Sequence, residues 1–379
     1  MKHFKNALVY VAGEGLKKCD LSFEEKILSF EAEGEEVKLP ADAVVLPGFI
    51  DEHIHGAGGA DAMDGTEEAL STIARTVAEE GTTGFLATTM TQSPSAILKA
   101  MRAVKAYRAK SPKEGAAVLG VHLEGPFIAC KFKGAQPEEY VAKPDTAVFD
   151  GYNEASGNAV KIVTLAPEAD GAQELVAHLA ERGIVASIGH TAAKCEDIAR
   201  AADAGARNVT HTYNAQSPLH HRDIGTVGSA LLDDRLNCEL IADTIHVSVP
   251  AMQLLVKCKP EEKLTLITDA IRAKGLGDGE SELGGQKVFV KNGEARLADG
   301  TLAGSVLRMN RAVENLVKRA GVPFLQAVDC ATINPARNLG LEKQAGSIAL
   351  GKNADFTVLD GNYDVVCTVR GGNIVYARS

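Results

Sequence analysis

The chain has 379 residues, which is enough for one large domain and a smaller one. Its formal net charge of -10 disfavours a broad nucleic-acid-binding surface, and no apolar run has the length of a signal peptide or a membrane span. The 7 Cys residues are scattered without a Cys-x-x-Cys pair, which disfavours a disulfide framework and favours the reducing cytoplasm. We therefore expect a cytoplasmic protein without nucleic-acid or membrane partners.

Residues 1–45 alternate short apolar runs with Gly and charged turns, a pattern typical of β-strands. Similar runs return after residue 335, at Ala354–Leu359 and Val365–Val369. Arg370–Asn373 then predicts a hairpin turn before a last strand at 374–376. We expect the two chain ends to pair into one small β-domain made of residues 1–48 and 336–379.

Residues 49–335 repeat a pattern of strand, loop and helix. In the stretch 66–80, apolar residues recur at helical spacing on one face and Gly81 ends the pattern, and a second helix is predicted from Ser93 to Ala109. Helical stretches lie between most of eight apolar runs, near residues 46–51, 83–88, 118–123, 160–165, 184–188, 207–210, 238–242 and 264–268. Eight strands alternating with helices predict an α/β fold, a (β/α)8 barrel of the TIM type.

Several of these runs end in residues that can bind a metal ion. His53 and His55 end the first run, and because they are two residues apart their side chains lie on the same side of a strand. Glu124 ends the third run, and His190 and His211 end the fifth and sixth. Strand ends on one rim of a barrel converge, and imidazole nitrogens with a carboxylate suit a tetrahedral zinc site. The structural alternative is a set of polar side chains that hydrogen-bond to their own turns.

Asp269 ends the eighth run. A carboxylate beside a metal can take a proton from water and later give it to a leaving nitrogen. The structural alternative is an N-cap for a helix that follows. His122 lies two residues before Glu124 and therefore deeper along the same strand, which predicts a core or supporting position rather than a metal ligand.

Two segments have the composition of ligand-binding loops. The loop after the sixth run carries Asn214 and Ala215, followed by two histidines and Arg222, a set of donors that suits a phosphate group. Its alternative is a solvated polar loop. Residues 302–305 are interpreted as the start of a helix whose free N–H groups face a ligand, and His246, after the seventh run, as a residue above the site.

Longer motifs make the chain resemble the N-acetylglucosamine-6-phosphate deacetylases of the amidohydrolase superfamily over essentially its whole length. The motifs are Pro47–Asp51, His122–Phe127, Lys133–Gln136, His211–Ala215, Ser217–Arg222, Thr268–Ala270, Leu302–Ser305 and Gly351–Asp355. The resemblance implies a (β/α)8 barrel, a small β-sandwich built from both termini, and a homodimer. It also implies hydrolysis of N-acetyl-D-glucosamine 6-phosphate to D-glucosamine 6-phosphate and acetate, in amino-sugar catabolism and cell-wall sugar recycling.

The resemblance further implies a divalent metal, zinc in first place and otherwise iron or another divalent ion. Its principal ligands would be Glu124, His190 and His211, with Asp269 as the catalytic acid/base. His53 and His55, which some relatives lack, leave room for a second ion shared with Asp269, so we expect one or two ions per chain.

The substrate implied by the resemblance is a small sugar phosphate. Gln136 stands where some relatives carry His, so that polarisation of the substrate amide would depend more on the metal. The residues expected to bind the sugar phosphate are Ala135, Gln136, Asn214, Ala215, Arg222, His246, Leu302, Ala303 and Gly304.

Two other functions fit parts of the sequence. One is a cyclic-amide hydrolase of the dihydroorotase or hydantoinase type, which needs a carboxylated Lys at the end of the fourth strand. Here Lys161 stands at the start of that strand. The other is a non-catalytic barrel that serves as a scaffold or binding protein. Such proteins usually lose metal ligands, and none is missing from this sequence.

Overall fold

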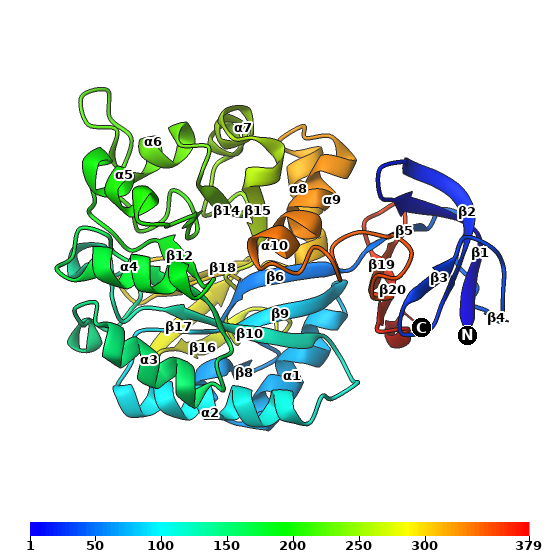
Figure 1. The fold of residues 1–379 in the computed structure, drawn as a ribbon, viewed down its shortest axis with the longest axis horizontal. Helices are drawn as coiled ribbons and strands as arrows, with labels where there is room; N and C mark the ends of the chain where they lie inside the picture. The colour runs from blue at the N-terminus through cyan, green and yellow to red at the C-terminus, as the bar shows by residue number, and fades with distance from the viewer. Residues whose placement is uncertain (379) are drawn as a thin grey trace.

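The computed structural model describes residues 1–378, and its centre is an eight-stranded parallel sheet (Figure 1). The eight apolar runs of the sequence all form strands of this sheet, which confirms the predicted barrel. In order around the sheet they are β6 (Phe49–Ile54), β9 (Thr82–Thr89), β10 (Ala117–Glu124), β11 (Val160–Leu165), β12 (Val185–Ile188), β13 (Asn208–Val209), β14 (Asn237–Ile241) and β15 (Leu264–Ile267).

The helices cover the outside of this sheet. In the first of them, the predicted apolar face of Leu70, Ile73 and Val77 is buried, and the Thr66 side chain accepts a hydrogen bond from the N–H of Ala69 as an N-cap. The helices are α1 (Glu67–Ala78), α2 (Pro94–Ala109), α3 (Thr146–Ala155), α4 (Ala172–Glu181), α5 (Cys195–Asp203), α6 (Gly225–Leu232), α7 (Val249–Cys258), α8 (Met309–Lys318), α9 (Phe324–Ala331) and α10 (Ile333–Asn338). No helix in residues 1–378 combines the length and the apolar character that crossing a membrane requires.

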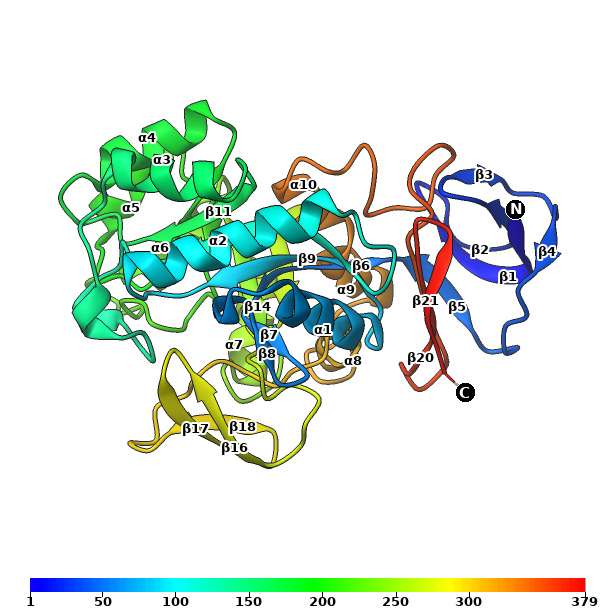
Figure 2. The same ribbon diagram turned by 90° about the horizontal axis from the view of Figure 1, so that it is seen from below.

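Both chain ends contribute to a second sheet, which stands to one side of the barrel (Figure 2). Its strands are β1 (Lys2–Val11), β2 (Gly15–Phe23), β3 (Ile27–Ser29), β4 (Glu35–Glu36), β5 (Val44–Pro47), β19 (Phe356–Leu359), β20 (Val365–Arg370) and β21 (Asn373–Ala377). The ends meet where β5 pairs antiparallel with β19. Phe4, Phe23 and Phe356 lie together in the separate core of this sheet. The expected domain limits at residues 48 and 336 stay a prediction.

A three-stranded antiparallel sheet lies between β15 and α8 in the chain, and the sequence patterns did not predict it. It consists of β16 (Gly279–Leu283), β17 (Gln286–Lys291) and β18 (Glu294–Leu297). Its buried side chains, among them Leu283 and Val288, pack against Met90 near the rim of the barrel.

The helix expected to begin at residues 302–305 is absent, and that prediction was wrong. The next helix, α8, begins at Met309. The backbone at 302–305 is instead used in extended pairing, because the N–H of Ser305 donates to the carbonyl of Asp269 at 2.8 Å and the N–H of Ile271 donates to the carbonyl of Ser305 at 3.0 Å. This pairing places residues 302–305 beside Asp269.

The barrel closes between its first and last strands, β6 and β15. The Thr268 hydroxyl donates to the Asp51 carboxylate at 2.5 Å, and the Thr268 N–H points at the same carboxylate at 3.3 Å. One residue further along, the N–H of Asp269 donates to the carbonyl of His53 at 2.8 Å. Both Asp51 and Thr268 are fully buried. The closure therefore sets the distance between two of the segments that carry predicted metal ligands.

Thr268→Val should destabilise the protein by about 1.5–3 kcal/mol, because it removes a hydrogen bond from a buried carboxylate. Urea unfolding followed by circular dichroism measures the loss. Thr265→Val is the matched control, since Thr265 lies three residues earlier on β15 and is equally buried but donates to the neutral amide of Asn237 at 3.2 Å. Equal losses in the two variants would mean that the carboxylate contact at the closure contributes no more stability than a hydrogen bond to a neutral amide.

Candidate metal centre

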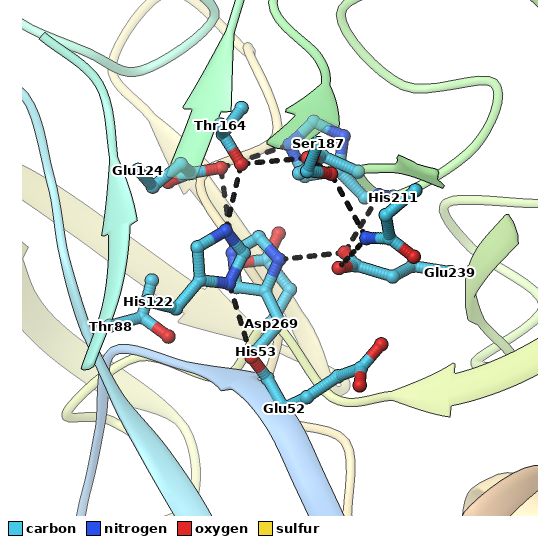
Figure 3. Close-up of polar contacts among 12 residues, drawn as sticks. Glu52, His53, Thr88, His122, Glu124, Thr164, Ser187, His211, Glu239 and Asp269 are labelled. Carbon is cyan, nitrogen blue, oxygen red and sulfur yellow. Dashed lines mark hydrogen bonds and ion pairs between the residues drawn. The ribbon is translucent and has the colours of Figure 1, made fainter. Parts of the chain in front are cut away.

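The predicted metal-binding residues meet at the carboxyl ends of the barrel strands, beside a cavity of about 350 Å³. Figure 3 shows the side chains of His53, Glu124, His211 and Asp269 turned toward one another from different strands. His55 and His190 complete the set and also line the cavity. The structure therefore brings together all six residues that the sequence suggested for the metal and the proton transfer.

Glu124, His190 and His211 form a compact group of potential ligand atoms. The Nε2 atoms of the two histidines lie 3.1 Å apart, and each lies 3.1 Å from Oε1 of Glu124. Ligand atoms about 2.0–2.1 Å from a tetrahedral zinc ion are separated by roughly 3.3 Å. The three atoms thus form a triangle of the size that one face of such a site requires.

The other ring nitrogens of these histidines explain why the group suits a cation. Nδ1 of His190 lies 2.8 Å from the carbonyl of Phe132, and Nδ1 of His211 lies 3.1 Å from the carbonyl of Asn214. A carbonyl oxygen only accepts, so each Nδ1 carries a proton and each neutral ring presents its lone pair at Nε2. Two lone pairs and a carboxylate then face one another, and a metal ion relieves that repulsion.

His53, His55 and Asp269 form a second group of potential ligands on the other side of Glu124. Oδ1 of Asp269 lies 3.4 Å from Nε2 of His53 and 3.3 Å from Nε2 of His55. Nε2 of His53 is buried and has no hydrogen-bond partner among the described residues. Glu124 reaches both groups, because its Oε2 lies 3.2 Å from Nε2 of His55. These residues could hold a second ion, and Glu124 lies within reach of both groups.

Three of these residues occupy the left-handed backbone region, with φ of 47° at His190, 30° at His211 and 47° at Asp269. This conformation is uncommon for residues other than Gly and is often found at functional sites. It turns the chain sharply at the strand end and points the side chain over the rim. Gly189 precedes His190 with its backbone so close to Thr210 that a Cβ would lie 2.6 Å from the Thr210 Cβ, as expected for a close approach.

The charges of the centre are strongly coupled. Burial by itself raises the pKa of Glu124, but the nearby imidazoles of His53, His190 and His211 bring it well below its usual range. Burial likewise raises the pKa of Asp269, and His53 and His55 lower it to about 2. Burial lowers the pKa of His53, but Glu124 and Asp269 raise it to about 9. The carboxylates are therefore ionised, and without a metal His53 holds a proton at neutral pH.

Metal binding should weaken as the pH falls, because an imidazole must lose its proton to bind an ion. The pKa of His53 in the metal-free protein is about 9, so below pH 9 a metal ion must displace a proton from this imidazole. The apparent metal affinity of the group that contains His53 should therefore fall about tenfold per pH unit for each proton displaced. Competition against a fluorescent chelator between pH 6 and 8.5 measures this slope. A constant affinity over that range would contradict the proposed ligand set.

His190→Ala should remove metal from the principal group at every pH. His178→Ala is the matched control, since His178 lies on α4 and pairs with Asp150 at 2.8 Å, away from the centre.

Most of the predicted sugar-binding residues line the cavity: Ala135, Gln136, Asn214, Ala215, His246, Leu302 and Gly304. The amide of Gln136 is already engaged, because its Nε2 donates to Oε2 of Glu124 at 2.7 Å and its Oε1 accepts from the N–H of Thr91 at 2.6 Å. Gln136 therefore orients the Glu124 carboxylate. The imidazole of His246 lies with its Nδ1 2.6 Å from Asp243 and leaves Nε2 for a ligand.

Two predicted sugar-binding residues are not among those that line the cavity within residues 1–378 of one chain. Ala303 is fully buried and packs in the core of the three-stranded sheet. Arg222 is exposed, and its guanidinium lies 2.6 Å from Nε2 of His221. Their substrate-binding roles stay predictions.

Sequence reasoning missed other residues of the cavity wall, notably Met90, Lys131, Phe132, Leu283 and Thr301. Among the described residues, Lys131 is the only Lys or Arg whose side chain lines this wall. In the sequence it could have been found from its position just before the Lys133–Gln136 motif. His122 is buried below the centre. Its Nδ1 lies 3.1 Å from the carbonyl of Glu52 and its Nε2 2.7 Å from the Thr164 hydroxyl, so it supports the barrel as expected.

A family model described as "Amidohydrolase family" matches residues 44–375. The chain belongs to the amidohydrolase family. This family is metal-dependent, and three groups of His, Glu and Asp in this amidohydrolase could hold a metal ion: the two described above and a third made of His53, His122 and Glu239.

Similar proteins agree with this membership. The amidohydrolase is 44% identical over 348 residues to an N-acetylglucosamine-6-phosphate deacetylase of Bacillus subtilis, covering 91% of this chain and 88% of the relative. It is 40% identical over 325 residues to an N-acetylgalactosamine-6-phosphate deacetylase of Escherichia coli O157:H7, covering 86% of each chain. A crystal structure of N-acetylglucosamine-6-phosphate deacetylase from Thermotoga maritima superposes with a TM-score of 0.90 at 36% identity, covering 99% of this chain and 100% of that one.

Proposed function

We propose that this amidohydrolase is a deacetylase of amino-sugar 6-phosphates, which converts N-acetyl-D-glucosamine 6-phosphate into D-glucosamine 6-phosphate and acetate. The observation that carries the proposal is the group of Glu124, His190 and His211 next to Asp269, at one end of a cavity of about 350 Å³. The similarity to deacetylases supports this choice of reaction. Its role would be amino-sugar catabolism and cell-wall sugar recycling in the cytoplasm.

N-Acetyl-D-galactosamine 6-phosphate is the second candidate substrate, because one relative at 40% identity is named for the galactosamine epimer. Acetate release from the two epimers, compared as kcat/KM on the purified protein, decides between them. His190→Ala is the inactive control. If neither epimer releases acetate with a metal-loaded protein, the proposed function is wrong.

The environment of the fourth strand argues against a cyclic-amide hydrolase with a carboxylated lysine. Lys161 stands near the start of β11, and the residue near its rim end is Thr164. The Thr164 hydroxyl is bonded to His122 and to the hydroxyl of Thr210, each at 2.7 Å. β11 therefore offers a short hydrogen-bonded hydroxyl where that class requires a long lysine side chain.

A divalent ion, when bound, supplies Lewis-acid chemistry by lowering the pKa of water and polarising an amide oxygen. We infer zinc as this ion, because two imidazoles and one carboxylate at tetrahedral spacing are typical zinc ligands, with iron as the alternative. Glu124, His190 and His211 would hold it. His53 and His55, with Asp269, would hold a second.

Asp269 is placed to move the proton. Its carboxylate lines the cavity, and its pKa of about 2 keeps it ionised and ready to accept a proton from the attacking water. The same carboxyl group then donates that proton to the leaving nitrogen, which departs as an amine. Residues 302–305, paired to the Asp269 backbone, hold this side chain at the cavity.

Asp269→Asn should lower kcat for the 6-phosphate by at least about 10²- to 10⁴-fold, because the amide keeps the shape but cannot accept the proton. Substrate binding, measured by calorimetry, should change little, and metal content at the principal group should be retained. A variant with more than half of the wild-type kcat would exclude Asp269 as the acid/base.

The phosphate group would be bound at the open end of the cavity, and two cations compete for this role. Lys131 lines the cavity of its own chain, whereas Arg222 lies on an exposed loop outside it. We infer a homodimer in which the loop around Arg222 lies near the subunit contact and reaches a phosphate there. An Arg suits this role because its guanidinium can bond two phosphate oxygens at once.

Arg222→Ala and Arg222→Lys should each lower kcat/KM for the 6-phosphate about ten- to a hundredfold, since a charge-assisted hydrogen bond contributes roughly 1.5–3 kcal/mol. The slow reaction of unphosphorylated N-acetylglucosamine should not change. Lys131→Ala is the comparison variant. A phosphate-specific loss in Lys131→Ala alone would assign the phosphate to the cation on the cavity wall.

A further inference from the structure

The buried carboxylate of Glu239 links the two groups of potential metal ligands from below. Glu239 lies on β14 and is fully buried. Figure 3 shows it between His53 and His211, although β15 separates β14 from β6 in the sheet. The Glu239 side chain therefore reaches across the interior of the barrel to a residue on a strand that is not its neighbour.

Three hydrogen bonds converge on this carboxylate. Its Oε2 lies 3.0 Å from Nδ1 of His53 and accepts from the N–H of His211 at 3.1 Å. Its Oε1 accepts from the side-chain amide of Asn208 at 2.8 Å. One oxygen atom thus contacts a member of each ligand group, the imidazole of His53 in one and the strained backbone of His211 in the other.

The contact to His53 decides which ring nitrogen is available. An ionised carboxylate only accepts hydrogen bonds, so Nδ1 of His53 must be the donor. In the neutral ring the lone pair is then at Nε2, which is the buried atom without a hydrogen-bond partner among the described residues. That atom lies 3.4 Å from Glu124 and 3.4 Å from Asp269, on the metal side of the ring.

We propose that Glu239 is a positioning residue that holds His53 ready to bind the second metal ion. The inference rests on the metal-dependent function proposed above. Glu239 does not contact the cavity, because it is absent from the described residues that line it. Its effect on metal binding passes through the ring of His53.

Glu239→Gln tests this positioning role, because it keeps the size but presents one oxygen to three donors. If the amide nitrogen faces His53, Nδ1 must accept and the proton moves to Nε2, where it blocks metal binding. The second ion should bind about ten- to a hundredfold more weakly, the range observed when a hydrogen-bond partner of a metal ligand is lost. The first ion should bind within about threefold of wild type. Equilibrium dialysis with zinc and elemental analysis measure both steps, independently of activity.

Glu52→Gln is the matched control. Glu52 is fully buried in the same part of the barrel and neighbours His53 in sequence, but its carboxylate bonds to the side chain of Asn338 at 3.0 and 3.1 Å. Both metal affinities should stay at wild-type values in this variant. An unchanged second affinity in Glu239→Gln, or an equal loss in Glu52→Gln, would overturn the role of Glu239.

A second measurement does not require a folded variant. In the metal-loaded wild-type protein labelled with ¹⁵N-histidine, long-range ¹H–¹⁵N spectra should show His53 protonated at Nδ1, and a proton at Nε2 would overturn the inference. Wild-type protein that deacetylates its substrate but takes up only one ion would also overturn it while leaving the proposed function intact. Protein that binds two ions but does not deacetylate the substrate would overturn the proposed function and leave the role of Glu239 intact.

Discussion

Asp51 accepts hydrogen bonds from the hydroxyl and the N–H of Thr268, and through this pair the first and last strands of the barrel meet. On both segments, a residue of the candidate metal centre lies within two positions of this pair. His53 follows Asp51 on β6, and Asp269 follows Thr268 after β15. A barrel that opened here would separate the second group of ligands, whereas the principal group on β10, β12 and β13 would be less affected. The stability of the closure and the occupancy of the second position are therefore physically linked.

The centre places two carboxylates and four imidazoles in a largely buried space. Burying such groups is costly unless their charges are paired, and in the metal-free protein the proton on His53 contributes to that pairing. A bound metal ion would replace that proton. The carbonyl groups that bond to Nδ1 of His190 and His211 keep the ligand lone pairs directed at this ion. With metal present, binding and the stability it adds should rise with pH in the neutral range, whereas in the metal-free protein the stabilisation from the raised pKa of His53 is lost as the pH rises from about 6.5 toward 9.

The two sides of the cavity are built differently. The metal side consists of residues at strand ends whose backbone is hydrogen-bonded in the barrel. The sugar side consists of loops, including the segment around Lys131 and the wall contributed by Leu283 from the three-stranded sheet. Reaction type depends on the first side and substrate choice on the second. This division agrees with the presence of both N-acetylglucosamine-6-phosphate and N-acetylgalactosamine-6-phosphate deacetylases among similar proteins.

The sequence predicted the barrel, and it also indicated the six candidate metal and proton-transfer residues that the structure brings together at the rim. An apolar run that ends in His53, Glu124 or His190 indicates both a strand and a candidate metal ligand, because the carboxyl ends of the parallel strands lie together at one rim of the barrel. Local patterns also showed β-structure at both chain ends. The three-stranded sheet was missed, because β16 is mostly polar and β17 buries only Val288 and Val290, a weaker signal than the apolar runs of the barrel strands.

The contacts through which these residues cooperate join distant parts of the chain and exist only in the folded barrel. Residues 302–305 carry a sequence compatible with a helix start, but backbone pairing with Asp269 and Ile271 outweighs that local preference. The role of Glu239 was invisible in the sequence, since a carboxylate within an apolar strand has no local pattern that names its partner. Its hydrogen bond to His53 joins residues 186 positions apart. Such contacts follow from the closure of the barrel, because only the closed barrel brings the interior side chains of non-adjacent strands within hydrogen-bond distance.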